Sequence, residues 1–182
     1  WNFDSSSLAN AGSSGFVHDG TAVGTLTYTN STLFGGSGKA LDASVASSYM
    51  SIDNTDSDFG GYFDTFDQTT FSISLWMKAP VGGVWQQAAR KGHDASWQIS
   101  QNSAGPAGRV IVGGVNDSKL GTAFNDEWHH VVLTVENGTA AKSYWDNIEK
   151  TSAGMASITY TPATASALLF GVIVGLVDEI KI

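Results

Sequence analysis

The chain has 182 residues, 42% of them hydrophobic, and this predicts one globular domain, residues 1–182, with a core of its own. It carries 9 Lys and Arg against 17 Asp and Glu, and the net charge of −8 excludes the basic footprint that nucleic acids and anionic membranes require. The absence of cysteine excludes disulfides and thiolate metal sites.

Short alternating segments run along the chain, and no stretch shows sustained helical periodicity. Residues 70–79 place Phe71, Ile73, Leu75 and Met77 at every second position, as a half-buried strand requires. Turns rich in Gly, Asn and Asp separate this segment from others of the same kind, which span 109–115, 129–138 and 141–150. Short strands punctuated in this way indicate an all-β sandwich or barrel.

Two further features complete this pattern. The pair Asn137-Gly138 lies between two of the segments and is a strong signal for a β-hairpin. The longest apolar run, residues 165–177, is too short to span a bilayer and contains Gly. We therefore expect a hairpin at Asn137 and no membrane insertion.

Eight motifs follow one another over almost the whole chain: WNFD (1–4), GGSGKALDAS…SYMSID (35–53), FSISLWMKA (71–79), AARKGHDASWQI (88–99), GRVIVGG (108–114), DEWHHVVLTVENG (126–138), KSYWDN (142–147) and FGVIVGLVDEIKI (170–182). In this order they resemble the laminin-G-like and pentraxin-like jelly rolls of the concanavalin A-like lectin/glucanase superfamily. The resemblance implies a two-sheet antiparallel β-sandwich (jelly roll).

The segment Trp128-His129-His130 raises the question of metal binding or proton transfer. The resemblance implies that it begins a core strand, where Trp128 supplies apolar area and the His rings hydrogen-bond to nearby loops. Adjacent residues of a strand point to opposite faces, so the two His cannot easily grip one metal. We interpret them as architectural.

The acidic residues do not form the pattern of a glycoside hydrolase, which needs two carboxyl groups at a fixed separation. The chain has only four Glu, and none has another acid two residues away on the same strand face. No nucleophile elbow, phosphate-binding loop or zinc-protease motif is present. The sequence therefore predicts a protein that is not an enzyme, with a glucanase-like hydrolase as a disfavoured alternative.

The resemblance also implies a structural Ca²⁺ where the beginning and end of the chain meet. Asp4 and Asp178 occupy the matching positions, and a backbone carbonyl near Gly38 could complete the oxygen ligands that Ca²⁺ prefers. The alternative is that Asp4 caps a turn and Asp178 is a solvated strand residue. A second acidic stretch, residues 53–67, is interpreted as a solvated loop.

Sugar-binding sandwiches combine aromatic side chains with amides and carboxylates on loops. Three Trp lie outside the motif positions expected in the core, and two polar loops and a turn offer hydrogen-bonding partners. The candidate ligand-binding residues are Trp85, His93, Asp94, Trp97, Asn116, Asp117, Trp145 and Asn147. For Trp145 the alternative is a side chain packed on the sheet.

Three functions remain open at this point. The first is a non-catalytic carbohydrate-binding or adhesion module of a secreted or surface protein. The second is a structural or decoration protein of a phage particle or an extracellular filament, and the third is the disfavoured hydrolase. The expected partners are a glycan or a cell-surface or virion protein, with a possible homo-oligomer, and the expected location is extracellular, at a cell surface or a virion surface.

Overall fold

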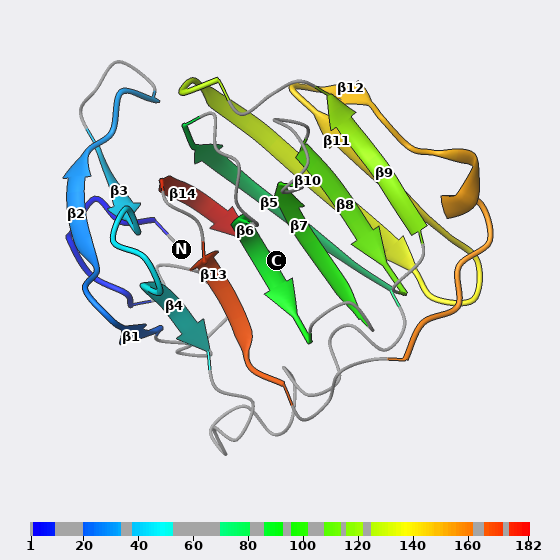
Figure 1. The fold of residues 1–182 in the computed structure, drawn as a ribbon, viewed down its shortest axis with the longest axis horizontal. Coiled ribbons are helices and arrows are strands. Elements are labelled where there is room, and N and C mark those ends of the chain that lie inside the picture. Colours follow the sequence, from blue (N-terminus) through cyan, green and yellow to red (C-terminus); the bar gives the residue numbers. More distant parts are fainter. Residues whose placement is uncertain are drawn as a thin grey trace.

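The protein is a sandwich of two antiparallel β-sheets, one lying over the other in Figure 1. The computed structural model describes residues 2–9, 20–33, 38–52, 70–80, 86–92, 96–101, 108–113, 116–121, 125–161, 166–172 and 175–182. This architecture confirms the predicted all-β jelly-roll class. No helix within these residues is long and apolar enough to cross a membrane.

Sheet I contains seven strands within the described residues. Their order across the sheet is β1 (Thr21–Val23), β4 (Tyr49–Ile52), β13 (Leu168–Val172), β6 (Gln86–Lys91), β7 (Trp97–Gln101), β8 (Gly108–Val112) and β9 (Asn116–Gly121).

Sheet II also contains seven strands in the described part of the chain. Their order is β12 (Ile148–Glu149), β11 (Ala140–Trp145), β10 (Trp128–Glu136), β5 (Thr70–Lys78), β14 (Leu176–Lys181), β3 (Lys39–Asp42) and β2 (Thr27–Asn30). A 3₁₀ turn, η3 (Ala153–Met155), follows β12.

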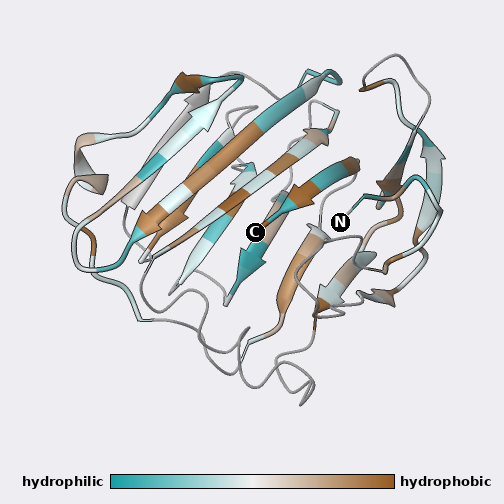
Figure 2. Cartoon of the chain, turned by 180° about the vertical axis from the view of Figure 1, so that it is seen from behind, coloured by the Kyte–Doolittle hydropathy of each residue, from teal (hydrophilic) through white to brown (hydrophobic). Residues whose placement is uncertain are grey.

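The core lies between the sheets because the strands alternate. On β5, Phe71, Ile73, Leu75 and Met77 are buried while the residues between them are more exposed, as the period of two predicts. Figure 2 shows hydrophobic and hydrophilic residues alternating along the strands of sheet II. The buried apolar face of β5 packs against sheet I, where Phe71 meets Trp97 with ring centroids 5.6 Å apart.

The hairpin predicted at Asn137-Gly138 is confirmed. It joins β10 to β11, and Gly138 adopts the positive φ of 84° that such a turn favours. The Asn137 side chain bonds the backbone of Tyr160 twice, at 3.2 Å from each group, and so ties the turn to the segment after η3.

The two ends of the chain meet, as the resemblance implied, but the first residues form a turn and not a strand. The Asn2 Nδ2 donates to Glu179 Oε1 of β14 at 3.0 Å. Phe3 is fully buried in the core, with its ring 6.4 Å from that of Tyr28. The N-terminal segment therefore packs on sheet II beside β14, the last strand in the sequence.

Candidate functional site

The outward face of sheet I is set by the register of β13, β6 and β7. Phe170, Ala89 and Ile99 are paired across these strands and are fully buried in the core. Their neighbours in sequence therefore point outward. Leu169 and Arg90 are the corresponding outward pair on β13 and β6.

Uncharged polar side chains continue this face toward β7. Gln98 is the register partner of Arg90, and Ser100 is the partner of Gln87. The Gln87 Nε2 donates to Gln98 Oε1 at 2.6 Å. The side chains of Gln87, Gln98 and Ser100 are all buried. Buried amides on a sheet face hold fixed positions, because leaving their hydrogen bonds unmade is costly.

An open pocket of about 270 Å³ adjoins this face, where β6 ends and β13 begins. It is lined by Arg90, Gly92, Ser166, Ala167 and Leu169. The chain turns away from β6 at Gly92, whose φ of 62° suits glycine. The pocket therefore has a charged side at Arg90, a hydroxyl at Ser166 and an apolar side at Ala167 and Leu169.

Among the described residues that line the pocket, Arg90 alone is charged. Its side chain is partly exposed, and within the described residues it forms no hydrogen bond or ion pair. Its direct neighbours across the strands, Leu169 and Gln98, carry no charge. The guanidinium therefore presents its donors to the pocket without a neutralising partner beside it.

Of the predicted ligand-binding residues on or near sheet I, only Trp97 has a side chain that the structure describes. Trp85, His93 and Asp94 lie outside the described residues, although His93 directly follows Gly92 of the pocket. Asn116 and Asp117 belong to β9, where Asp117 is the register partner of Ile111. Their side chains also lie outside what the structure describes.

Trp97 faces the core and is fully buried. Its side chain offers no surface to a ligand in solution. β7 is buried on both faces, yet it carries Gln and Ser on its outward face, as an exposed strand would. The sequence alone therefore does not show that Trp97 is buried.

Trp145 and Asn147 lie on sheet II and not beside the pocket. Trp145 is 6% exposed and belongs to the core cluster, so the structure places it as a packed residue. Its ring centroid lies 4.5 Å from that of His129. Asn147 is exposed in the turn between β11 and β12, at a positive φ of 66°. Neither residue is among the described residues that line the pocket.

The two His point to opposite faces of β10, as predicted. His129 Nδ1 lies 2.7 Å from Asp146 Oδ2, and its Nε2 lies 2.9 Å from Asn125 Oδ1. His130 Nε2 lies 2.8 Å from Ser74 Oγ. Both rings are thus held by hydrogen bonds to neighbouring strands and loops, which confirms the expected contacts.

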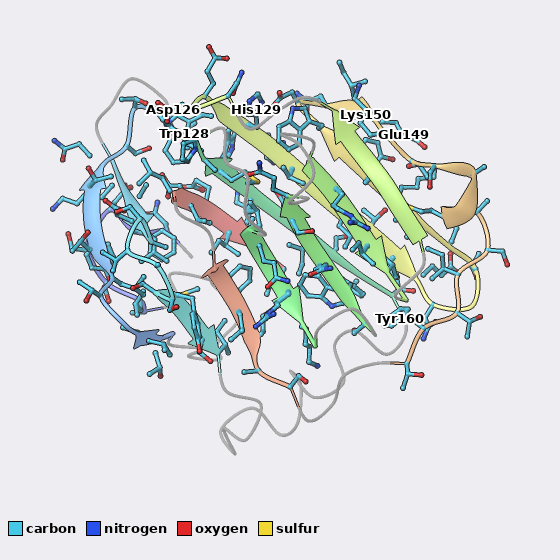
Figure 3. All side chains as sticks on the ribbon, in the orientation of Figure 1. Asp126, Trp128, His129, Glu149, Lys150 and Tyr160 are labelled. Carbon is cyan, nitrogen blue, oxygen red and sulfur yellow. The ribbon has the colours of Figure 1, made fainter. Side chains whose placement is uncertain are left out.

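Trp128 differs from the expectation of a core residue, because it is partly exposed. It is in register with Lys78, on the outward face of sheet II, and its Nε1 donates to Thr32 Oγ1 at 2.9 Å. Figure 3 shows Asp126, Trp128 and His129 together at the start of β10. The polar atoms at this end of the sandwich bind one another.

Two of the predicted calcium ligands, Asp4 and Gly38, lie against each other, and Asp4 is near enough for its charge to act on Asp178. The Asp4 carboxylate lies directly against Gly38, and its Oδ1 accepts a hydrogen bond from Lys39 N at 2.9 Å. The carbonyl of Gly38 accepts from Ser31 N at 2.9 Å. Asp178 is 4% exposed, and its Oδ1 accepts from Glu179 N at 2.8 Å.

Burial and neighbouring charges perturb the carboxyl of Asp178. Burial raises the pKa of its carboxyl, and the charges of Glu179 and Asp4 raise it further, against hydrogen bonds from Glu179 N and Ser31 that lower it. The described residues contain no group of three or more acidic or His side chains that could hold a metal. Ca²⁺ commonly takes backbone carbonyls as well as carboxylates.

The sequence analysis missed Arg90, Ser166, Ala167 and Leu169, which make the pocket. Ser166, Ala167 and Leu169 carry no signal, since they are ordinary residues at the start of a strand. Arg90 does carry one, because the chain has only two arginines in 182 residues. An arginine at an outward position of a strand in an acidic protein was a detectable candidate.

The sequence matches one known protein family over most of its length. The profile described as "Concanavalin A-like lectin/glucanases superfamily" matches residues 46–179. Among curated proteins, no sequence match was found.

Solved structures with a similar fold include three binding domains of bacterial proteins. Domain 4 of AbnA, a GH43 extracellular arabinanase from Geobacillus stearothermophilus in complex with arabinotriose, has a TM-score of 0.66 and 21% identity, covering 99% of this chain and 88% of that one. The binding domain of Paraclostridial Mosquitocidal Protein 1 has a TM-score of 0.61 and 12% identity, covering 96% and 48%.

The third structure is of botulinum neurotoxin type C, whose cell entry is described as dependent upon interaction with two ganglioside molecules. It has a TM-score of 0.50 and 12% identity, covering 93% of this chain and 40% of that chain. This chain therefore spans less than half of the two toxin structures. At these identities the likeness is one of fold.

Proposed function

The chain belongs to the concanavalin A-like lectin/glucanase superfamily, and from that premise we propose that it is a non-catalytic carbohydrate-binding module that acts outside the cell. The observation that carries the proposal is the pocket of about 270 Å³ on the outward face of sheet I. Fold alone does not assign a function in this superfamily, so the proposal rests on the chemistry of this pocket.

The pocket offers what a sugar ring needs. Arg90 and Ser166 supply hydrogen-bond donors for hydroxyl or ring oxygens, and Ala167 and Leu169 supply an apolar side for the C–H groups of the ring. The five described residues of the lining include no carboxyl group, whereas hydrolysis of a glycosidic bond uses two. This composition supports binding without catalysis.

Two of the similar structures support a glycan as the partner. The arabinanase domain was solved with arabinotriose, and the neurotoxin is described with gangliosides. The arabinanase is an extracellular enzyme, which supports an extracellular location for this chain as well.

A direct test fills the pocket. We expect Ala167→Trp to weaken glycan binding at least about tenfold, because the indole would occupy the space of a sugar ring. Ala156→Trp adds the same side chain at an exposed position after η3, outside the pocket, and should leave binding unchanged. A glycan array selects the ligand, titration calorimetry measures Kd, and thermal melting confirms that both variants fold.

Two results would contradict the proposal. Full binding by Ala167→Trp would place the glycan elsewhere on the protein. No binding of any glycan by the unaltered protein would favour the alternative of a structural or decoration protein.

We also propose that a structural Ca²⁺ binds between Asp4, the Gly38 carbonyl and Asp178. Support comes from the buried Asp178 carboxyl, whose pKa is raised by burial and by the Asp4 charge. The ion would neutralise the two carboxylates and join the N-terminal turn to β14, and it would take no part in a reaction.

A further inference from the structure

We propose that the pocket of sheet I binds the carboxylate of an acidic sugar through the guanidinium of Arg90. This inference deepens the proposed glycan-binding function and rests on it. The observation behind it is the placement of Arg90, which has no ionic partner among the described residues, at the edge of an open pocket in a protein whose net charge is −8.

The distribution of charge makes Arg90 unusual in this chain. The chain has two arginines, Arg90 on β6 and Arg109 on β8, and both belong to sheet I. Ser100, the outward partner of Gln87, is also the register partner of Arg109, so both arginines point away from the core on the same face. An arginine at a pocket of an otherwise acidic protein favours an anion over a neutral ligand.

The two arginines differ in their surroundings. Arg109 already takes part in an interaction within the protein. Arg90 lines the pocket and, in the described part of the chain, has no hydrogen bond or ion pair. An arginine held on a sheet face without a carboxylate beside it is completed by a carboxylate from a ligand, since its planar donors match the two oxygens of a carboxylate.

The size and lining of the pocket fit one acidic sugar ring. Its volume of about 270 Å³ lies just below the range of roughly 300–1,000 Å³ that holds drug-sized ligands. Leu169 and Ala167 form the apolar side against which the ring C–H groups pack, and Ser166 adds a hydroxyl. The Arg90 position then sets the orientation, with the carboxylate of the sugar toward β6.

The test compares acidic sugars with their uncharged counterparts. The probes are oligosaccharides of galacturonic, glucuronic and N-acetylneuraminic acid, each paired with its methyl ester, together with a sulfated and a neutral oligosaccharide of the same length. We expect at least one acid to bind ten- to a hundredfold more tightly than its ester, as charge-assisted hydrogen bonds imply. Raising the salt concentration should weaken binding of the acid and not of the ester.

Variants assign the preference to Arg90. Arg90→Gln should remove the difference between acid and ester, and Arg90→Lys should keep part of it, because a lysine retains the charge without the planar pair of donors. Lys142→Gln changes the net charge by the same amount on an exposed residue of β11 in sheet II, and it should leave the preference intact. Thermal melting of each variant confirms folding.

The outcomes separate this inference from the proposed function. If the protein binds glycans but treats each acid and its ester alike, or prefers the sulfated probe, or keeps its preference in Arg90→Gln, the acidic-sugar inference is wrong and glycan binding stands. If no glycan of any charge binds, the proposed function fails and the inference fails with it.

Discussion

The polar side chains at the start of β10 in sheet II and Arg90 at the pocket of sheet I have different surroundings, although the two sheets enclose the same core. At the start of β10 in sheet II, the polar groups bind one another: His129 contacts Asp146 and Asn125, and His130 contacts Ser74. On sheet I, Arg90 borders an open pocket and has no such partner among the described residues.

Residue types that often carry chemistry therefore do not by themselves mark a ligand-binding site. The His pair and Trp128 are the most suggestive residues in the sequence, yet their polar atoms are already used within the fold. An imidazole held on both nitrogens, as His129 is, has no atom left to offer a ligand. Arg90 at the pocket forms no hydrogen bond with any described residue, and this is where we propose that a ligand binds.

The largest effect that tests this comparison is expected from Trp97→Ala. Trp97 is fully buried and packs on Phe71, so its removal should cost about 3–5 kcal/mol of unfolding free energy. Trp128→Ala should cost less, because Trp128 is partly exposed. Denaturant unfolding of both variants measures the two losses. Equal losses, or a larger loss at Trp128, would show that the two tryptophans are wrongly placed.

The second effect concerns Asp178, the one buried carboxylate on sheet II that could still bind an external partner. A cation that binds only the folded state stabilises it by about 2.7 kcal/mol at a hundredfold excess over Kd. EDTA should therefore lower the melting temperature, and Ca²⁺ should restore it better than Mg²⁺, because carbonyl-rich sites of flexible geometry suit the larger ion. A melting curve that ignores both EDTA and Ca²⁺ contradicts the calcium proposal.

Asp178→Asn is the control, and the direction of its effect on stability follows from the raised pKa of Asp178. The folded protein holds a proton on Asp178 more tightly than the unfolded chain, whose pKa is 3.8, so this stabilising contribution is lost as the pH rises through the folded pKa. At neutral pH without a cation, the asparagine variant should melt no lower than the parent. It should also lose most of the response to Ca²⁺.

A smaller effect sharpens the structural role of the His pair. Asp146 accepts hydrogen bonds from His130 N at 2.9 Å and lies 2.7 Å from His129 Nδ1, so Asp146→Ala should cost about 1–2 kcal/mol. The neighbouring Asn147→Ala is the control, because both residues have positive φ and the change tests backbone strain alone. Glycan binding should survive in both variants. Loss of binding in a folded Asp146→Ala protein would move the site to sheet II.

Much of the fold was predictable because its signals are local. The period of two on β5 fixes which residues enter the core, and Asn137-Gly138 fixes the β10–β11 hairpin. The meeting of the two chain ends came from the resemblance and not from any local pattern. Trp128 was misplaced because it belongs to the outward alternation of β10, in register with Lys78, and only the pairing with β5 shows this.

The pocket was not predictable, because it arises where two strands distant in sequence lie side by side. Arg90 and Leu169 are 79 positions apart and become neighbours only through the pairing of β6 with β13. Trp145 is one of the predicted ligand-binding residues and lies next to a turn. The core instead accepts its ring, which packs beside His129.

The smallest expected effect is a pH dependence of stability from His130. Burial lowers its pKa below 6.5, the Lys181 charge lowers it further, and the Asp146 charge opposes both. The folded state therefore binds a proton less readily than the unfolded chain, so the contribution of neutral His130 to stability is present above pH 6.5 and is lost as the pH falls toward the folded pKa.

Urea unfolding at pH 7.5 and pH 5.5 should show this loss in the parent and a smaller loss in His130→Gln, which keeps a hydrogen-bonding group near Ser74. Asp146→Asn should enlarge the loss, because it removes the charge that favours protonated His130. If His130→Gln and the parent lose the same free energy on acidification, His130 is not a titrating group of this fold, and the difference between the two sheets then rests on hydrogen bonding alone.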